Sequence, residues 1–263
     1  MKNLVIIFLS LIILSGCKEA TADLKTTNKK VNDWALLDFV KVDSLNPILK
    51  PTPSLSFTCP LNNKEILWEE RNVLNPSAIV KDDKVYMFYR AQDLSGTSRI
   101  GMAVSTDGLH FEKSPTPVFY PDEDEMKVYE WNYKKGPETT NSEDCYFCYF
   151  DGVEDPRIVE SEDGTYFLTY TSYDGKTARL SIASSKDLIN WTKHGLVLSD
   201  EKYKDTWSKA GAIVSKLVGN KVIATRIDDK YWMYFGDTNL FMAYSDDLID
   251  WEIAENDESK KMI

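Results

Sequence analysis

The sequence repeats one pattern of strands and turns three times, and this repeat limits the possible folds more than any other feature. Each unit reads as an apolar strand, a polar turn, an aromatic strand and a third strand that ends in Ser-x-Asp before Phe or Trp. The units span residues 75–114, 154–194 and 209–254. Small antiparallel sheets of this size cannot bury both faces alone, so they stack radially as propeller blades. The repeat therefore predicts an all-β fold, a β-propeller.

Two segments outside the repeats extend this prediction. Residues 46–74, with "LSFTCPL" and "EILWEE", could supply strands to a further blade. Residues 120–150 form an insertion rich in acidic and aromatic residues, and we expect it to overhang the centre of the propeller. A propeller has about four to eight blades, whereas three full units are visible before Ile263. We therefore expect residues 46–263 to form a partial propeller domain that lacks the last part of its ring.

The acidic balance of the chain excludes one broad class of partner. The 263 residues include 31 Lys and Arg against 42 Asp and Glu, which gives a formal net charge of −11. Nucleic acid is bound mainly through Lys and Arg at its phosphates. We therefore expect no nucleic-acid partner. The seven Trp and 14 Tyr are many for this length, and they suit sugar rings as well as a core.

The N-terminus has the features of a processing signal. Lys2 precedes an apolar stretch at residues 4–14 that is too short for a permanent membrane span, and "LSGC" closes it at Cys17. This ending resembles the bacterial lipoprotein box. The resemblance implies a signal peptide at 1–17, lipidation of Cys17 and anchoring in the cell envelope, at the outer membrane or in the periplasm. An ordinary secretory signal is the alternative. Residues 18–45 are polar and lack apolar periodicity, which predicts a flexible stalk.

Three further cysteines, Cys59, Cys145 and Cys148, do not form a recognisable metal site. "CYFC" at Cys145 and Cys148 has the spacing of a redox or zinc pair, but the sequence has no second pair and only two histidines. We interpret Cys145 and Cys148 either as two cysteines that are close in sequence by chance or as a local disulfide. No metal and no cofactor are expected.

Polar and charged residues flank the apolar strands at the start of the first strand and the end of the second strand of each unit. In an antiparallel blade these positions lie on the same face, so we expect them to rim the central funnel. They are Asn75 and Arg90 in the first unit, Glu154, Asp155, Tyr173 and Asp174 in the second, and Lys209 and Asp237 in the third.

Structural roles are open for several of these residues. Arg90 could pair with a neighbouring carboxylate, and Asp174 belongs to an Asp-Gly turn. Ser-x-Asp recurs in every unit, which indicates a turn and core anchor. "EDPR" occurs once, and acids followed by Pro are unusual at the start of a strand. Asp155 is therefore the better candidate for chemistry. Adjacent strand residues usually point to opposite faces, which would separate Glu154 from Asp155.

An ordered set of motifs resembles glycoside hydrolase family 130. "NPSAIV", "YRAQ", "GVEDPR", "YTSYDGKTARL", "WSKAGAIV" and "KYWMYFGDT" occur in the family's order over about residues 46–254. The resemblance implies a five-bladed propeller that cleaves β-mannosides by phosphorolysis or hydrolysis. It implies that Asp155, in the Glu-Asp-Pro-Arg motif, is the general acid. It further implies that Asn75 and Arg90 bind the sugar, with Lys209 and Asp237 nearby.

The resemblance also implies inversion at the cleaved bond of a β-mannoside oligosaccharide or glycan. One acid protonates the leaving group while water or phosphate attacks from the opposite face. Phosphate needs converging cations, and Lys209 and Arg226 are available, but "KAGA" departs from the Arg-Asp pattern of many family phosphorylases. We therefore predict an inverting β-mannosidase, with Asp237 as one candidate base. The alternative is a β-mannoside phosphorylase with inorganic phosphate as co-substrate.

A glycan-binding surface lipoprotein without catalysis is the alternative from another class. The "EDPR" motif favours an enzyme. Members of the family continue beyond Ile263 through a Val-Glu-Pro-Gly-Pro type motif and a closing blade. We therefore expect a C-terminally truncated ring. A truncated ring favours the glycan-binding protein without catalysis.

Overall fold

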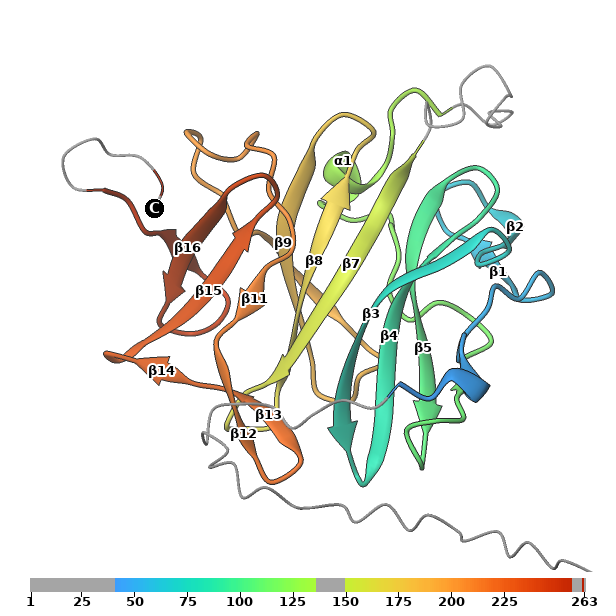
Figure 1. Ribbon diagram of the computed structural model, residues 1–263. Helices are drawn as coiled ribbons and strands as arrows, with labels where there is room; N and C mark the ends of the chain where they lie inside the picture. Colours follow the sequence, from blue (N-terminus) through green and yellow to red (C-terminus); the bar gives the residue numbers. More distant parts are fainter. Residues whose placement is uncertain (1–40, 136–149, 257–261, 263) are drawn as a thin grey trace, which may run out of the picture. The chain divides into compact units, whose positions relative to one another are not determined.

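The computed structural model of this protein consists mainly of β-sheets arranged side by side (Figure 1). The structure describes residues 41–135, 150–256 and 262. The named strands all belong to one compact unit that begins at Asp43. Cys17, the predicted signal peptide and most of the predicted stalk lie outside the described residues. The end of the stalk segment forms a short 3-10 turn, η1 (Asp43–Leu45).

Three four-stranded antiparallel sheets follow one another along the chain, and we call them blades 1, 2 and 3. Blade 1 consists of β3 (Asn72–Lys81), β4 (Lys84–Gln92), β5 (Thr97–Ser105) and β6 (Glu112–Lys113). Blade 2 consists of β7 (Asp151–Glu160), β8 (Tyr166–Tyr173), β9 (Ala178–Ser185) and β10 (Thr192–Leu196). Blade 3 consists of β11 (Ala212–Ile213), β15 (Lys230–Gly236), β16 (Leu240–Ser245) and β17 (Trp251–Ile253), with β14 (Arg226–Ile227) also paired to β15. The three repeats of the sequence are thus three sheets.

The remaining elements are short. The hairpin of β1 (Ser56–Cys59) and β2 (Lys64–Leu67) precedes blade 1, and helix α1 (Lys127–Glu130) lies in the predicted insertion. Cys59 is a buried free thiol, whereas Cys145 and Cys148 lie outside the described residues. No helix within the described ranges is long and apolar enough to cross a membrane.

The start of blade 3 differs from the sequence prediction. The third repeat was expected to open with one apolar strand before its aromatic strand, but the chain forms β11 and then a separate hairpin of β12 (Ser215–Val218) and β13 (Lys221–Ala224). β13 runs parallel to the end of β7, where Ile223 pairs with Glu160. The hairpin therefore connects blade 3 to the end of β7 that lies farthest from Asp151.

The recurring Ser-x-Asp motif closes the turn after the third strand of each blade. In blade 2, Ser185 Oγ accepts the N–H groups of Asp187 and Leu188, and Asp187 Oδ1 accepts those of Ile189 and Asn190. The residue after the Asp has a left-handed backbone in all three copies: Gly108, Leu188 and Leu248, with φ of 73°, 72° and 71°. The prediction of a turn and core anchor is confirmed, because both leucines are almost fully buried.

The cores lie between the blades. One buried cluster joins Phe88 of blade 1 to Leu168 of blade 2, and another joins Leu180 of blade 2 to Met233 of blade 3. Blade 2 is therefore packed between blades 1 and 3, as radial stacking requires. The predicted all-β propeller architecture is confirmed, and three blades lie within the described residues.

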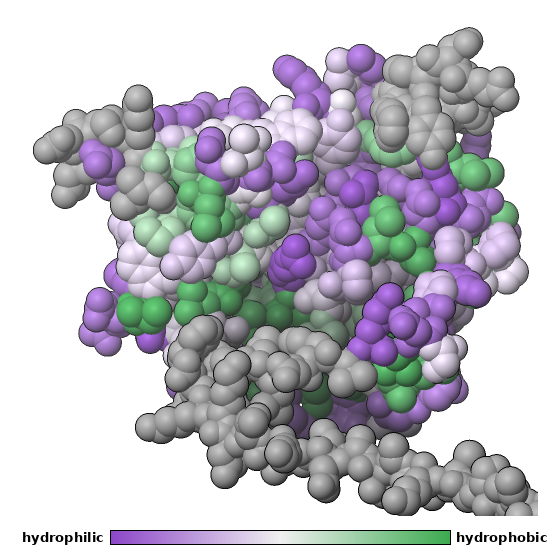
Figure 2. All heavy atoms as spheres, in the orientation of Figure 1, coloured by the Kyte–Doolittle hydropathy of each residue, from purple (hydrophilic) through white to green (hydrophobic). Residues whose placement is uncertain are grey.

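Blade 3 exposes several apolar and aromatic side chains. Figure 2 shows hydrophobic side chains on the surface over this blade, and Ile227, Tyr234 and Leu240 are exposed by 51%, 44% and 70%. In β8 of blade 2, by contrast, every residue but Tyr173 is buried. The apolar surface of blade 3 is thus uncovered by other described residues.

Blades 1 and 2 are joined edge to edge at Gly152. β5 pairs in parallel with β7 through Thr97 opposite Asp151 and Ser98 opposite Gly152. Gly152 has φ of 112°, and a Cβ atom there would lie 2.1 Å from the carbonyl oxygen of Ser98. Only glycine fits this approach. The joint fixes the start of β7, where the candidate site lies.

Candidate active site

Two equivalent β-bulges shape the candidate site. The β3–β4 register shifts between Leu74 and Ser77, and the β7–β8 register shifts between Glu154 and Arg157. Each bulge contains a residue followed by Pro, which cannot donate a ladder hydrogen bond. These residues are Asn75 and Asp155, whose left-handed backbones have φ of 46° and 51°. Asn and Asp adopt this conformation more readily than most residues. The acid and proline at the start of a strand thus form a bulge that takes the Asp out of the ladder.

Asn75, Arg90 and Asp155 meet at this point, as the sequence predicted. Asn75 Nδ2 donates to Asp155 Oδ1 at 2.6 Å, and Arg90 Nη1 lies 3.5 Å from the same oxygen. The three side chains come from β3, β4 and β7, so two blades contribute. The side chain of Asp155 keeps 17% of its surface exposed. The carboxylate is held on one oxygen and remains accessible.

Glu154 faces the same arginine. Its Oε1 accepts from Arg90 Nη2 at 2.6 Å and from Ser98 Oγ at 3.2 Å. The alternation of a regular strand would separate Glu154 from Asp155, but the bulge interrupts it and both carboxylates approach Arg90. The expectation of opposite faces is therefore wrong here. The structural role considered for Arg90, pairing with a carboxylate, is also present.

Burial dominates the titration of Glu154. The pKa of Glu154 is raised from 4.5 to about 7, chiefly by desolvation and also by the charge of Asp155. The charges of Arg90 and Lys209 and the Ser98 hydrogen bond oppose this rise without cancelling it. Glu154 is therefore a carboxyl that exchanges its proton near neutral pH.

A chain of polar side chains in blade 1 holds Arg90 in place. Arg90 Nε donates to Ser98 Oγ at 3.0 Å, and Gln92 Nε2 donates to the same hydroxyl at 3.2 Å. Asn72 Nδ2 donates to Gln92 Oε1 at 3.0 Å. Ser98, Gln92 and Asn72 were not among the site residues predicted from the sequence. The sequence did contain a feature that could have identified them. All three are polar residues at strand ends, and Arg90 was selected by the same criterion.

Lys209 and Asp237 pair with each other. Lys209 Nζ lies 3.4 Å from Asp237 Oδ1, and both side chains are partly exposed. The backbone N–H of Gly236 donates to the Lys209 carbonyl at 2.9 Å, which holds the two segments together. Within the described ranges neither residue hydrogen-bonds Asp155. The charge of Lys209 nevertheless lowers the pKa of Glu154, so Lys209 lies within electrostatic reach of the cluster.

Two other polar residues considered from the sequence serve turns. Asp174 Oδ1 accepts the N–H groups of Lys176 and Thr177, and its Oδ2 pairs with Arg179 at 2.8 Å. Arg226 donates to the backbone carbonyls of Asp229 and Asp246 at 2.7 and 2.6 Å. Both residues are thus engaged in structural contacts.

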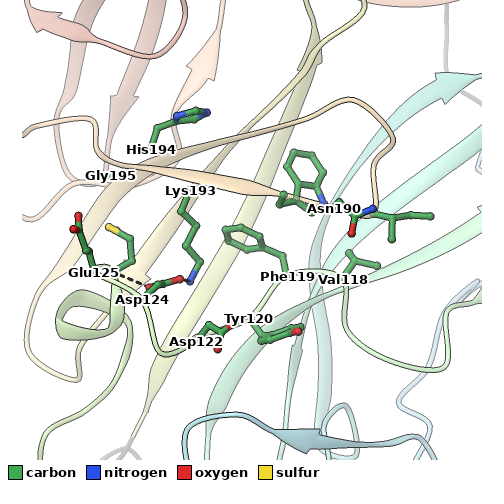
Figure 3. A pocket seen from close by; sticks show the side chains of 13 residues that line it. Val118, Phe119, Tyr120, Asp122, Asp124, Glu125, Asn190, Lys193, His194 and Gly195 are labelled. Atoms are coloured by element: carbon green, nitrogen blue, oxygen red, sulfur yellow. Dashed lines mark hydrogen bonds and ion pairs between the residues drawn. The ribbon is translucent and has the colours of Figure 1, made fainter.

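A hollow of about 530 Å³ lies elsewhere in the molecule, between β10 and the segment 118–126 (Figure 3). Lys193 reaches Asp124 there at 3.0 Å. None of the predicted site residues lines this hollow. Among the described residues, no group of three His, Cys, Asp or Glu could hold a metal ion.

Comparisons with known proteins identify the family. The family profile described as beta-1,4-mannooligosaccharide phosphorylase matches residues 41–257. A 1,2-beta-oligomannan phosphorylase from Thermoanaerobacter sp. (strain X514) is 31% identical over 195 residues, 70% of this chain and 53% of that protein. A beta-1,2-mannobiose phosphorylase from the same organism is 31% identical over 196 residues, 66% of this chain and 55% of that protein.

Solved structures agree. The crystal structure of a glycosyl hydrolase from Bacteroides ovatus has a TM-score of 0.78 at 36% identity and covers 89% of this chain and 63% of that chain. A second structure comes from work on the same family of mannoside phosphorylases, described as containing glycoside hydrolases that target beta-1,2 mannosidic linkages in Candida mannan. It has a TM-score of 0.77 at 36% identity and covers 88% of this chain and 62% of that chain.

The chain belongs to glycoside hydrolase family 130, and the five-bladed propeller class predicted from its sequence is confirmed. It spans about half the length of the curated relatives that it matches.

Proposed function

We propose that the protein cleaves β-1,2-mannosidic linkages of mannose oligosaccharides by phosphorolysis, with Asp155 as the general acid. The names of the family profile and of both curated relatives support a phosphorylase better than the mannosidase predicted from the sequence. The two relatives and one structural neighbour support the 1,2 linkage.

The contact of Asn75 and Arg90 with Asp155 Oδ1 carries this proposal. Asn75 donates to Oδ1 and Arg90 pairs with the same oxygen, which leaves Oδ2 to carry the proton. The proton passes from Asp155 to the leaving oxygen, directly or through a sugar hydroxyl. The bond from the anomeric carbon to that oxygen breaks while a phosphate oxygen bonds the opposite face of the carbon. The products are α-mannose 1-phosphate and an oligosaccharide shortened by one mannose.

Two cations near Asp155, Arg90 and Lys209, are of the kind that an anionic nucleophile needs. Water needs a base to activate it, whereas phosphate is already an anion and needs only cations to hold it. Asp237, the candidate base, is paired with Lys209 at 3.4 Å, and Glu154 is buried against Arg90. We propose that Arg90 and the partly exposed Lys209 attract the phosphate. Asn75 and Arg90 hold the sugar at the cleaved bond, and Asp237 orients Lys209.

Hydrolysis is the second candidate, because the description of one structural neighbour says that the family contains glycoside hydrolases. The test is to incubate the full chain with β-1,2-mannobiose, with and without inorganic phosphate. Mannose 1-phosphate formed only with phosphate supports phosphorolysis, and free mannose without phosphate supports hydrolysis. Asp155→Asn should lower the rate about 10²- to 10⁴-fold without unfolding the protein. Binding without either product would favour the glycan-binding protein without catalysis.

We further propose that the protein is anchored in the bacterial cell envelope through a lipid on Cys17. The support is the apolar stretch that ends in "LSGC". Cys17 lies outside the described residues, so the support comes from the sequence alone.

A further inference from the structure

Trp207 is an exposed aromatic residue beside the candidate active site, and the reaction proposed above gives it no role. It is 46% exposed. Its ring makes an edge contact with Tyr173, with centroids 6.1 Å apart and ring planes at 64°. Burial of an indole side chain stabilises a folded protein, and an exposed indole does not make this contribution. A binding role would explain its exposure.

The segment that carries Trp207 is fixed on both sides by β9. Arg179 Nε donates to the Lys204 carbonyl at 3.0 Å. On the other side, the N–H of Ser208 donates to the Ala178 carbonyl at 2.9 Å. Trp207 is therefore held between two anchored points. A rigid aromatic side chain loses little conformational entropy on binding, which favours affinity.

Tyr173 connects Trp207 to the catalytic cluster. In the β7–β8 ladder Glu154 pairs with Thr171 and Gly152 with Tyr173, so Glu154 and Tyr173 are diagonal neighbours on one face. Such positions are roughly 7–8 Å apart. After burial, the charge of Glu154 is the largest cause that raises the pKa of Tyr173. Trp207 therefore lies one aromatic ring beyond the residues that surround Asp155.

We propose that Trp207, supported by Tyr173, forms an additional subsite that stacks a mannose unit beyond the two joined by the cleaved bond. The C–H face of a pyranose ring is apolar, and it packs against the electron-rich face of an indole. The inference rests on the proposed function and extends it, because the subsite makes the protein prefer longer β-mannosides to the disaccharide.

The test compares ligands of two lengths in the full chain carrying Asp155→Asn, in phosphate-free buffer, so that cleavage is too slow to disturb the binding measurement. Binding of β-1,2-mannobiose and β-1,2-mannotetraose is measured by calorimetry. Adding Trp207→Ala should weaken tetraose binding about tenfold and mannobiose binding less than about twofold. Trp207→Phe should retain most of the tetraose affinity. The control is Leu217→Ala, which removes a side chain that is 67% exposed in the β12–β13 hairpin, at the far end of β7.

The outcomes separate the two proposals. If the Asp155→Asn protein binds neither sugar, the proposed function fails and the subsite fails with it. If it binds mannobiose but Trp207→Ala leaves tetraose binding unchanged, or weakens both ligands equally, the subsite is overturned and the proposed function stands. A selective loss of tetraose affinity that Leu217→Ala does not reproduce supports the subsite.

Discussion

Asn75 and Asp155 occupy the same bulge position in neighbouring blades, and their side chains meet with Nδ2 and Oδ1 2.6 Å apart. The third blade has a left-handed residue at the corresponding place, Ala210 with φ of 56°, whose methyl side chain offers neither a hydrogen-bond donor nor an acid. The repeated fold thus supplies one backbone geometry, and the residue placed on it differs from blade to blade. Blade 1 provides a donor and blade 2 provides an acid.

Removing the donor should impair catalysis and leave the fold intact. We expect Asn75→Ala to lower kcat/KM for β-1,2-mannobiose about 10²-fold, because small displacements of a catalytic group have effects of that size. The matched control is Asn190→Ala, since Asn190 Nδ2 also donates to a carboxylate, that of Asp187, at 2.7 Å but in an outer turn. Steady-state kinetics of both variants check this prediction. Equal losses in the two variants would show that the amide contact at Asp155 has no special part in catalysis.

The N-terminal prediction can be tested independently of catalysis. Cys17→Ser should move the protein from the membrane fraction to the soluble fraction, because the acyl chains would lose their attachment point. Cys59→Ser, at the buried thiol, should leave the protein in the membrane fraction. Fractionation followed by immunoblotting measures both variants. Membrane retention of Cys17→Ser would contradict lipidation at this residue.

The sequence predicted the parts of this fold that depend on local periodicity. Alternating apolar strands and the Ser-x-Asp turn recur three times, and each copy became a blade. The first strands of blades 1 and 2 begin at Asn72 and Asp151, slightly before the predicted Asn75 and Glu154. The β12–β13 hairpin was missed, although Gly219 before Asn220 is a recognisable hairpin turn, with φ of 63° at the glycine.

The candidate site was predictable only in part. Polar residues at strand ends located Asn75, Arg90 and Asp155, but strand alternation gave the wrong relation between Asp155 and Glu154. Only the register shift reveals that both face Arg90. The exposure of Trp207 could not be predicted either, because exposure depends on which distant segments cover a residue. Local sequence patterns carry no such information.

The joint between blades 1 and 2 predicts a sharp difference between two glycines. Gly152 and Gly164 both have left-handed backbones, with φ of 112° and 78°, but only Gly152 would place a Cβ atom against backbone, 2.1 Å from the Ser98 carbonyl oxygen. Gly152→Ala should lower the free energy of unfolding by more than about 3 kcal/mol or prevent folding. Gly164→Ala should lower it by about 1 kcal/mol from backbone strain alone. Urea unfolding followed by tryptophan fluorescence measures both changes, and similar losses would refute the tight joint.

The raised pKa of Glu154 makes stability depend on pH. The folded protein holds this proton up to about pH 7, whereas the unfolded chain releases it near the ordinary value of 4.5. The unfolded state therefore binds fewer protons in this window, and the contribution of Glu154 to stability falls as pH rises from about 4.5 to 7. Glu154→Gln removes the titration. The stability of the variant relative to the native protein should rise across this window by up to about 3 kcal/mol.

Glu130 offers a matched control for the catalytic part of this effect. Burial also raises its pKa to about 7, but it pairs with Lys193 at 2.5 Å and accepts from Tyr170, away from Asp155. Glu130→Gln should therefore change the pH dependence of stability in the same direction and leave the pH profile of kcat/KM unchanged. Glu154→Gln should also remove a limb of that profile near pH 7, because ionisation of Glu154 changes the charge beside Arg90. Thermal melts and kinetics from pH 4.5 to 8 test both variants. A limb that persists in Glu154→Gln would show that Glu154 affects folding but not the reaction.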